Sequence, residues 1–139
     1  MSALTVWVVD DNPMNLMLLR DLLELRGHRV LSALSAAEVE RLADGAPPPD
    51  VAILDIMLPD VDGVRLLHRL RARDRYGDVP FLAVTAHAMS GDRERLLAAG
   101  FAGYLPKPID TRRFVDEVER VAGGGRAADR VTTGTGTDR

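Results

Sequence analysis

Charged and polar side chains follow four of the short apolar runs in this sequence. Asp10 and Asp11 come directly after "VWVV", and Asp55 comes directly after "VAIL". Thr85 follows "FLAV", and Lys107 follows "YLP". If these runs are parallel strands of one sheet, their carboxyl ends lie at the same edge, which is where such sheets bind ligands. Three carboxylates, one hydroxyl and one ammonium group would then meet there.

Such a group of side chains could bind a divalent cation together with a phosphoryl group. Neighbouring carboxylates repel one another, and a bound cation would offset that repulsion. Mg²⁺ prefers hard oxygen ligands, typically one or two carboxylates with waters and a phosphate. Beside the cation, a carboxylate could act as a nucleophile and form an aspartyl phosphate. Thr85 could donate a hydrogen bond to one phosphoryl oxygen, and Lys107 could place a positive charge beside another.

Lys107 is the only lysine in the chain, because the other 17 of the 18 basic residues are arginines. A lysine ammonium is a compact charge on a flexible stem, whereas the arginine guanidinium is a planar group with five donors. A small pocket that holds one phosphoryl group beside a cation favours the compact charge. The single lysine therefore supports a phosphoryl site.

Five short apolar runs alternate with five amphipathic stretches, and together they predict the elements that position these side chains. The predicted strands are 4–9, 28–33, 50–54, 80–84 and 102–106, and the predicted helices are 13–27, 35–44, 62–73, 91–100 and 110–122. This alternation is typical of an α/β fold with a parallel sheet and right-handed crossovers. The strand runs are apolar throughout, as expected when helices cover both faces of the sheet.

Capping residues support three of the predicted helix starts. Asn12 is the expected N-cap of the first helix, and it precedes Pro13, a residue favoured at the first helical position. Ser35 has Glu38 three residues later, which is the spacing of a capping box. Asp110 is the expected N-cap of the last helix.

The composition excludes several classes of protein. A length of 139 residues suits one domain, and a hydrophobic fraction of 46% suffices for one core. The net charge of −3 argues against nucleic-acid binding, which normally uses a basic surface. The chain has no cysteine, and no apolar run approaches the roughly 20 residues of a membrane span. The N-terminus lacks a secretion signal, so we expect a cytoplasmic protein without membrane contact.

The C-terminal residues differ in composition from the rest of the chain. Residues 123–139 contain glycine, threonine and charge without a periodic apolar face. We therefore predict one domain over residues 1–122 and a disordered tail over 123–139.

Four motifs, "VVDDNPMN", "ILDIMLPDVDG", "AVTAHAM" and "AGFAGYLPKPI", occur in this order between residues 4 and 121. With this order and spacing, the chain resembles the receiver domain of bacterial two-component response regulators. The segments "DDNPMN", "TAHAM" and "LPKPID" are most similar to receivers that stand alone or belong to hybrid sensor kinases. The resemblance implies a flavodoxin-like (βα)5 fold with a five-stranded parallel sheet in the order 2-1-3-4-5.

The resemblance also assigns roles to the acidic residues. It implies that Asp55 is the phosphoacceptor and that Asp10 and Asp11 form an acidic pocket for Mg²⁺. Asp11 and Asp55 would bind the metal directly, and the backbone carbonyl of Met57 would supply a further ligand. Without the other motifs, Asp10 and Asp11 would be read as ordinary loop residues after a strand.

Four residues near the ends of the fourth and fifth strands complete the implied site. Thr85 and Lys107 would bind the phosphoryl group, and Tyr104 would be the switch aromatic that turns inward when the threonine moves. The Lys107–Pro108 bond would be cis, a conformation accessible mainly before proline. The simpler alternatives are that Thr85 is an ordinary strand residue and that Tyr104 only packs against the core.

Met57, the three histidines and the turn after Asp55 lie outside this central set. The positions of Met57 and His87 vary with phosphoryl lifetime in the family, so either side chain could modulate hydrolysis. For His87 we prefer an exposed loop position, and His28 and His68 are also expected on the surface. The turn after Asp55 and the start of the next helix account for Asp60, Asp62 and Gly63.

These assignments imply a signalling module rather than an enzyme that turns over an external substrate. A sensor histidine kinase or phosphotransferase would donate the phosphoryl group, and a downstream protein would bind the face of the fourth helix, fifth strand and fifth helix. We expect a free-standing protein that is monomeric or dimerises weakly when phosphorylated.

Two other functions would use part of the same set of residues. A Mg²⁺-dependent phosphohydrolase using Asp55 would usually need a second acid at the position of Met57, and a cap over its substrate. A receiver-like docking protein without phosphorylation would not need the complete set of Asp10, Asp11, Asp55, Thr85 and Lys107.

Overall fold

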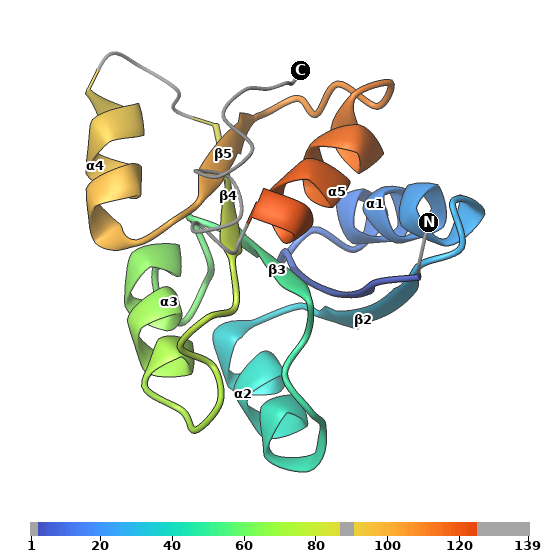
Figure 1. Cartoon of the computed structure of the whole chain (residues 1–139). Helices are drawn as coiled ribbons and strands as arrows, with labels where there is room; N and C mark the ends of the chain where they lie inside the picture. Colours follow the sequence, from blue (N-terminus) through green and yellow to red (C-terminus); the bar gives the residue numbers. More distant parts are fainter. Residues whose placement is uncertain (1–2, 87–90, 125–139) are drawn as a thin grey trace.

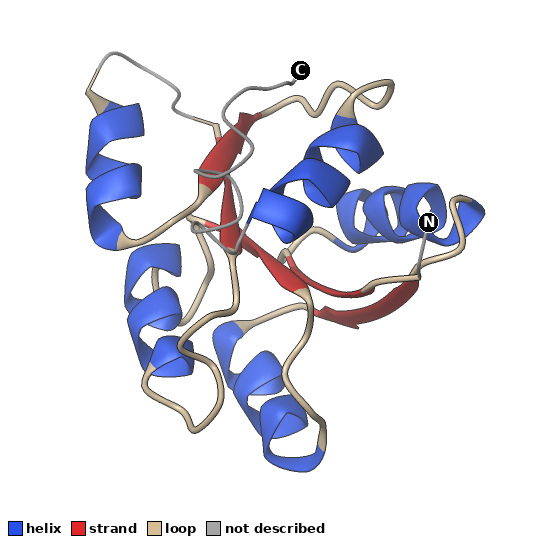
Figure 2. Cartoon of the chain, in the orientation of Figure 1, coloured by secondary structure: helices blue, strands red, loops and turns tan. Residues whose placement is uncertain are grey.

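Strands and helices alternate along the chain (Figures 1 and 2). The structure, a computed structural model, describes residues 3–86 and 91–124. The strands are β1 (Thr5–Val9), β2 (Arg29–Ala33), β3 (Val51–Asp55), β4 (Phe81–Thr85) and β5 (Gly103–Pro106). The helices are α1 (Pro13–Leu25), α2 (Ala36–Gly45), α3 (Gly63–Arg71), α4 (Asp92–Ala99) and α5 (Phe114–Gly124). This order of elements confirms the predicted α/β class.

The strands form one parallel sheet in the order β2-β1-β3-β4-β5. This order confirms the flavodoxin-like (βα)5 arrangement. Helices α1 and α5 cover one face of the sheet, and α2, α3 and α4 cover the other (Figure 1). Alternate strand residues point to opposite faces, so Val6 and Val8 pack under α1 and α5, whereas Trp7 and Val9 join the opposite core.

Two helix starts follow the predicted capping pattern. The Asn12 side chain accepts hydrogen bonds from the amides of Met14 and Asn15, which lie in the first turn of α1. At α2, the Ser35 hydroxyl accepts a hydrogen bond from the Glu38 amide, and the Glu38 carboxylate accepts one from the Leu34 amide. These contacts satisfy amides that have no partner within the helix.

The predicted start of the last helix is wrong. Helix α5 begins at Phe114, and Asp110 closes a turn instead of capping the helix. The Asp110 carboxylate accepts a hydrogen bond from the Arg112 amide, and its carbonyl accepts one from the Arg113 amide. Side-chain bonds to nearby amides compete with helical ones. The helix starts at Phe114, which is completely buried in the core.

The predicted surface position of His28 is also wrong, because this side chain is buried. Its Nδ1 accepts a hydrogen bond from the Leu4 amide at 3.0 Å, and its Nε2 lies 2.6 Å from a carboxylate oxygen of Glu119. The side chain therefore joins the start of β1 to α5. His28 directly precedes β2, a position that the sequence pattern does not distinguish from an exposed loop.

Within the described ranges, no helix combines the length and hydropathy needed to cross a membrane. Helix α5 extends to Gly124, two residues past the predicted end of the domain. Residues 125–139 of the predicted tail lie outside the described ranges.

Candidate functional site

Three carboxylates meet at the carboxyl edge of the sheet. Asp10 directly follows β1, and Asp55 is the last residue of β3, the neighbouring parallel strand. One carboxylate oxygen from each of Asp10, Asp11 and Asp55 lies within 4.8 Å of the other two. Asp10 and Asp55 are buried, whereas Asp11 is exposed. We call these three residues the acidic pocket.

The side chain of Asp10 is held at both carboxylate oxygens. Oδ1 accepts a hydrogen bond from the Asn12 amide at 2.9 Å, and Oδ2 accepts one from the side-chain amide of Asn15 at 2.6 Å. Asn15 lies in the first turn of α1 and was not identified from the sequence as part of the site. An amide side chain at this place, five residues after a strand-end aspartate, was the available signal. Together Asn12 and Asn15 fix the Asp10 carboxylate.

Asp55 has a different partner at each oxygen. Oδ1 accepts a hydrogen bond from the Met57 amide at 3.0 Å, and Oδ2 lies 2.8 Å from Nζ of Lys107. Met57 itself is exposed. These contacts orient the Asp55 carboxylate from both the following loop and the end of β5.

Lys107 brings one positive charge to the acidic pocket. Its Nζ also lies 3.7 Å from Oδ2 of Asp10. Burial alone would lower the pKa of Lys107, but the hydrogen bond to Asp55 and the charges of Asp10, Asp55 and Asp11 raise it overall. The Lys107 backbone amide donates to the carbonyl of Thr85 at 2.8 Å, and the Lys107–Pro108 bond is cis as predicted.

The carboxylate oxygens of the acidic pocket are suitable ligands for a hard divalent cation. One ammonium group faces three carboxylates, so negative formal charge remains, and a bound cation would offset it. Both Asp10 oxygens already accept hydrogen bonds, whereas Asp11 is exposed. All the available ligand atoms of the three side chains are oxygens, which is the preference of Mg²⁺.

The structure brings Thr85 to this edge of the sheet. Thr85 is the last residue of β4, between the strands of Asp55 and Lys107, and it is buried. Tyr104 is half-buried in β5 and packs against the core. His87, a predicted modulator, lies outside the described ranges. The switching roles of Thr85 and Tyr104 remain predictions.

The loop after Asp55 requires glycine at its end. A Cβ atom on Gly63 would lie 2.7 Å from the Asp55 carbonyl oxygen and 2.8 Å from Cα of Ile56. The Gly63 amide donates to the Ile56 carbonyl at 2.8 Å, and Asp62 caps α3 through the Arg65 amide. The prediction placed Gly63 at a helix start, and the structure shows that close backbone packing beside Asp55 is the reason for it.

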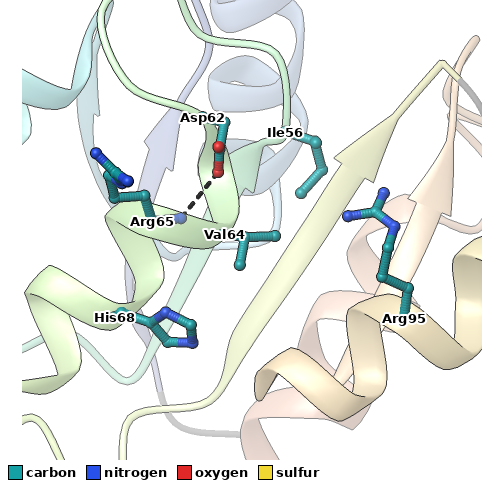
Figure 3. A pocket seen from close by; sticks show the side chains of 6 residues that line it. All are labelled: Ile56, Asp62, Val64, Arg65, His68 and Arg95. Carbon is teal, nitrogen blue, oxygen red and sulfur yellow. Dashed lines mark hydrogen bonds between the residues drawn. The ribbon is translucent and has the colours of Figure 1, made fainter.

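A separate hollow of about 460 Å³ lies between α3 and α4 (Figure 3). Its lining residues are Ile56, Asp62, Val64, Arg65, His68 and Arg95. No carboxylate of the acidic pocket lines this hollow, so the two features are distinct. His68 is exposed, as predicted, and its Nε2 lies 3.2 Å from the Ala99 carbonyl oxygen.

Comparison with known proteins identifies the family. The model of the response regulator receiver domain matches residues 6–119. The chain is 40% identical over 132 residues to the signal transduction histidine-protein kinase BarA of Escherichia coli strain K12, covering 94% of this chain and 14% of BarA. It is 36% identical over 119 residues to the polar-differentiation response regulator DivK of Brucella anthropi, covering 86% of this chain and 96% of DivK.

A solved structure supports the same assignment. The receiver domain of the sensor histidine kinase PA1611 from Pseudomonas aeruginosa PAO1 is 31% identical, with a TM-score of 0.77, over 88% of this chain and 99% of that domain. That domain has a magnesium ion coordinated in its active-site cleft. Receiver domains generally bind Mg²⁺ at an acidic pocket, and this chain has a cluster of three aspartates at the carboxyl edge of its sheet. The fold, the acidic pocket and the matched segment together place this chain in the response-regulator receiver family.

Proposed function

We propose that Asp55 accepts a phosphoryl group from a phosphohistidine of a sensor kinase or phosphotransferase, in a reaction that requires Mg²⁺. The observation that carries this proposal is the crowding of three carboxylates within 4.8 Å of one another, with Lys107 2.8 Å from Asp55. The similarity to BarA, a histidine-protein kinase, supports a partner of this class.

In the proposed reaction, an oxygen of Asp55 forms a bond to phosphorus as the phosphorus–nitrogen bond of the phosphohistidine breaks. The electron pair of that bond returns to the leaving imidazole. The Met57 amide holds the other Asp55 oxygen, so the nucleophilic oxygen is presented in a fixed orientation. Phosphoryl transfer needs positioning and charge stabilisation more than other chemistry.

Bound Mg²⁺ would offset the negative charge of the incoming phosphoryl group. Asp11, Asp55 and the backbone carbonyl of Met57 would hold the ion, with Asp10 completing the acidic pocket. Asn12 and Asn15 keep the Asp10 carboxylate facing the pocket. Lys107 would then contact a phosphoryl oxygen while remaining beside the pocket carboxylates.

Phosphorylation would act on a downstream partner through a change of conformation. We propose that Thr85 moves to the phosphoryl group and that Tyr104 turns further inward, which alters the face made by α4, β5 and α5. Their positions on adjacent strands β4 and β5 support this coupling. In this proposal the domain acts as a switch that promotes its own phosphorylation and dephosphorylation.

Mass spectrometry of the intact protein tests the proposal directly. Incubation with MgCl₂ and acetyl phosphate should add one acid-labile phosphoryl group, and Asp55→Asn should abolish the addition. Asp74→Asn removes an exposed carboxylate away from the pocket, and this control should be phosphorylated like the parent. A persistent adduct in Asp55→Asn, or no adduct in the parent, would refute the assignment, and turnover of many phosphate esters would indicate a phosphohydrolase.

A further inference from the structure

The loop that follows the phosphoacceptor is tied to a helix that lies elsewhere in the sequence. Asp60 is in the loop between β3 and α3, but its side chain contacts the first turn of α2. Its Oδ1 accepts a hydrogen bond from the Ala36 amide at 3.1 Å, and its Oδ2 accepts one from the Ala37 amide at 2.9 Å. One carboxylate therefore joins two segments that are more than 20 residues apart.

These contacts supply what the local cap of α2 leaves unsatisfied. The hydroxyl of Ser35, the N-cap residue, accepts only from the third amide of the helix, that of Glu38. Asp60 takes the first two. A carboxylate is favoured at a helix N-terminus by the free amides and by the helix dipole. The pKa of Asp60 is accordingly lowered: the hydrogen bond from the Ala37 amide is the largest cause, burial acts against it, and the amides of Ala36, Asp60 and Val61 lower it further.

The remainder of this loop is held mainly at its two ends. At its start, the Ile56 amide donates to the Val84 carbonyl at 3.0 Å, and the Met57 amide donates to Asp55. At its end, the Gly63 amide closes back onto the Ile56 carbonyl. Leu58 and Val61 pack against the core between these points. Between the two ends, the hydrogen bonds from the Ala36 and Ala37 amides to Asp60 are the polar contacts that attach the loop to α2.

We propose that Asp60 is a positioning residue for the phosphorylation site, holding the loop so that the Met57 backbone lies correctly beside Asp55. This inference rests on the proposed function, in which the Met57 carbonyl binds Mg²⁺. A loop that is already anchored does not have to be ordered when the cation binds, so less of the binding free energy is lost. Removing a group that orients a metal ligand without binding the metal itself typically lowers the metal affinity by about 10-fold or more.

A purely structural role for Asp60 makes a different prediction. If Asp60 only stabilised α2, then removing any cap of this helix would have the same consequence. Ser35→Ala provides the matched control, because it removes a cap from the same helix end without touching the loop after Asp55. Both variants should lower the midpoint of urea denaturation, so the comparison depends on measurements made on the folded proteins.

The first readout needs no cation. Hydrogen exchange of the Met57 amide, followed by NMR in the metal-free protein, should become faster in Asp60→Ala and stay near the parent rate in Ser35→Ala. Asp60→Asn keeps one acceptor oxygen and should be intermediate. This milder variant also serves if Asp60→Ala does not fold.

The second readout is a titration with MgCl₂ alone, followed by the amide signals near Asp55. Asp60→Ala should raise the dissociation constant for Mg²⁺ by about 10-fold, and Ser35→Ala should change it by less than about twofold. Equal behaviour of Asp60→Ala, Asp60→Asn and Ser35→Ala in both readouts would overturn the positioning role. The parent protein separates the two proposals: if it binds Mg²⁺ and gains the Asp55 adduct, the proposed function stands whatever the Asp60 variants do.

Discussion

The two edges of the sheet both contain buried polar groups, but their charges are balanced to different degrees. At the amino edge, His28 lies between the Leu4 amide and Glu119, and the two guanidinium nitrogens of Arg26 reach Glu119 and Asp116 at 3.0 and 3.1 Å. We call His28, Arg26, Asp116 and Glu119 the amino-edge cluster. Because the His28 Nδ1 accepts from Leu4, its Nε2 is the nitrogen that donates to Glu119.

At the carboxyl edge, three carboxylates share one lysine. Carboxylates that are held close together repel one another, and this repulsion costs free energy. The amino-edge cluster limits this cost, because its two carboxylates face one guanidinium and Glu119 also accepts a hydrogen bond from His28. The acidic pocket retains the cost, which a cation or a phosphoryl group with its cation would relieve. The difference separates a group of polar residues that stabilises the fold from one that is arranged for binding.

The largest expected loss of stability comes from removing His28 from the amino-edge cluster. His28→Ala removes the hydrogen-bond partner of the Leu4 amide and of Glu119 Oε2 and creates a cavity, so the free energy of unfolding should fall by about 3 kcal/mol. Urea denaturation in the absence of Mg²⁺ measures this loss. His28→Asn retains an acceptor near the position of Nδ1 and should lose about half as much. An unchanged denaturation midpoint in His28→Ala would mean that the cluster does not stabilise the fold.

A smaller effect is expected when the acidic pocket is supplied with its cation. At a Mg²⁺ concentration ten times the dissociation constant, the parent should gain about 1.4 kcal/mol in its free energy of unfolding. Asp55→Asn removes one carboxylate from the pocket and should gain much less. NaCl at equal ionic strength controls for screening of surface charges.

The His28→Asn variant sharpens the same measurement. Its cluster lies at the opposite edge of the sheet, so it should gain as much from Mg²⁺ as the parent. An equal gain in Asp55→Asn and the parent would show that Mg²⁺ acts elsewhere on the protein, and the contrast between the two edges would fail.

The smallest changes in stability are expected from exchanging the two types of basic side chain. Arg26→Lys loses a fork that contacts two carboxylates, but Arg26 is half-exposed, so the cost should be below about 1 kcal/mol. Lys107→Arg should also change the free energy of unfolding by less than about 1 kcal/mol. Its planar group fits the compact site poorly, so phosphorylation at Asp55 should no longer shift the NMR signals of Tyr104. Normal Tyr104 shifts in Lys107→Arg would remove the explanation offered for the single lysine.

The predictions that were confirmed rest on patterns that act over short distances. The alternation of apolar and amphipathic stretches predicted the order of the elements, and Asn12 and Ser35 predicted two helix starts. The resemblance implied the strand order, which the sheet confirms. The predictions for Asp110 and His28 were wrong because each depended on a competing contact. Asp110 bonds to its own turn, and His28 is buried by α5, which comes some 90 residues later in the chain.

The sequence by itself determined which chemical groups would meet at the carboxyl edge. Each of Asp10, Asp55, Thr85 and Lys107 follows or ends an apolar run, and parallel strands bring their carboxyl ends to one edge whatever the details of packing. Only the tertiary structure decided how these groups are held. Asn15 donates a hydrogen bond to Asp10, Asp60 accepts hydrogen bonds from α2, and Gly63 packs closely against the backbone after Asp55. Each of these contacts depends on a distance of about 3 Å between separate segments. Hydrogen bonds and steric contacts weaken or vanish within a fraction of an ångström, so no sequence spacing specifies them.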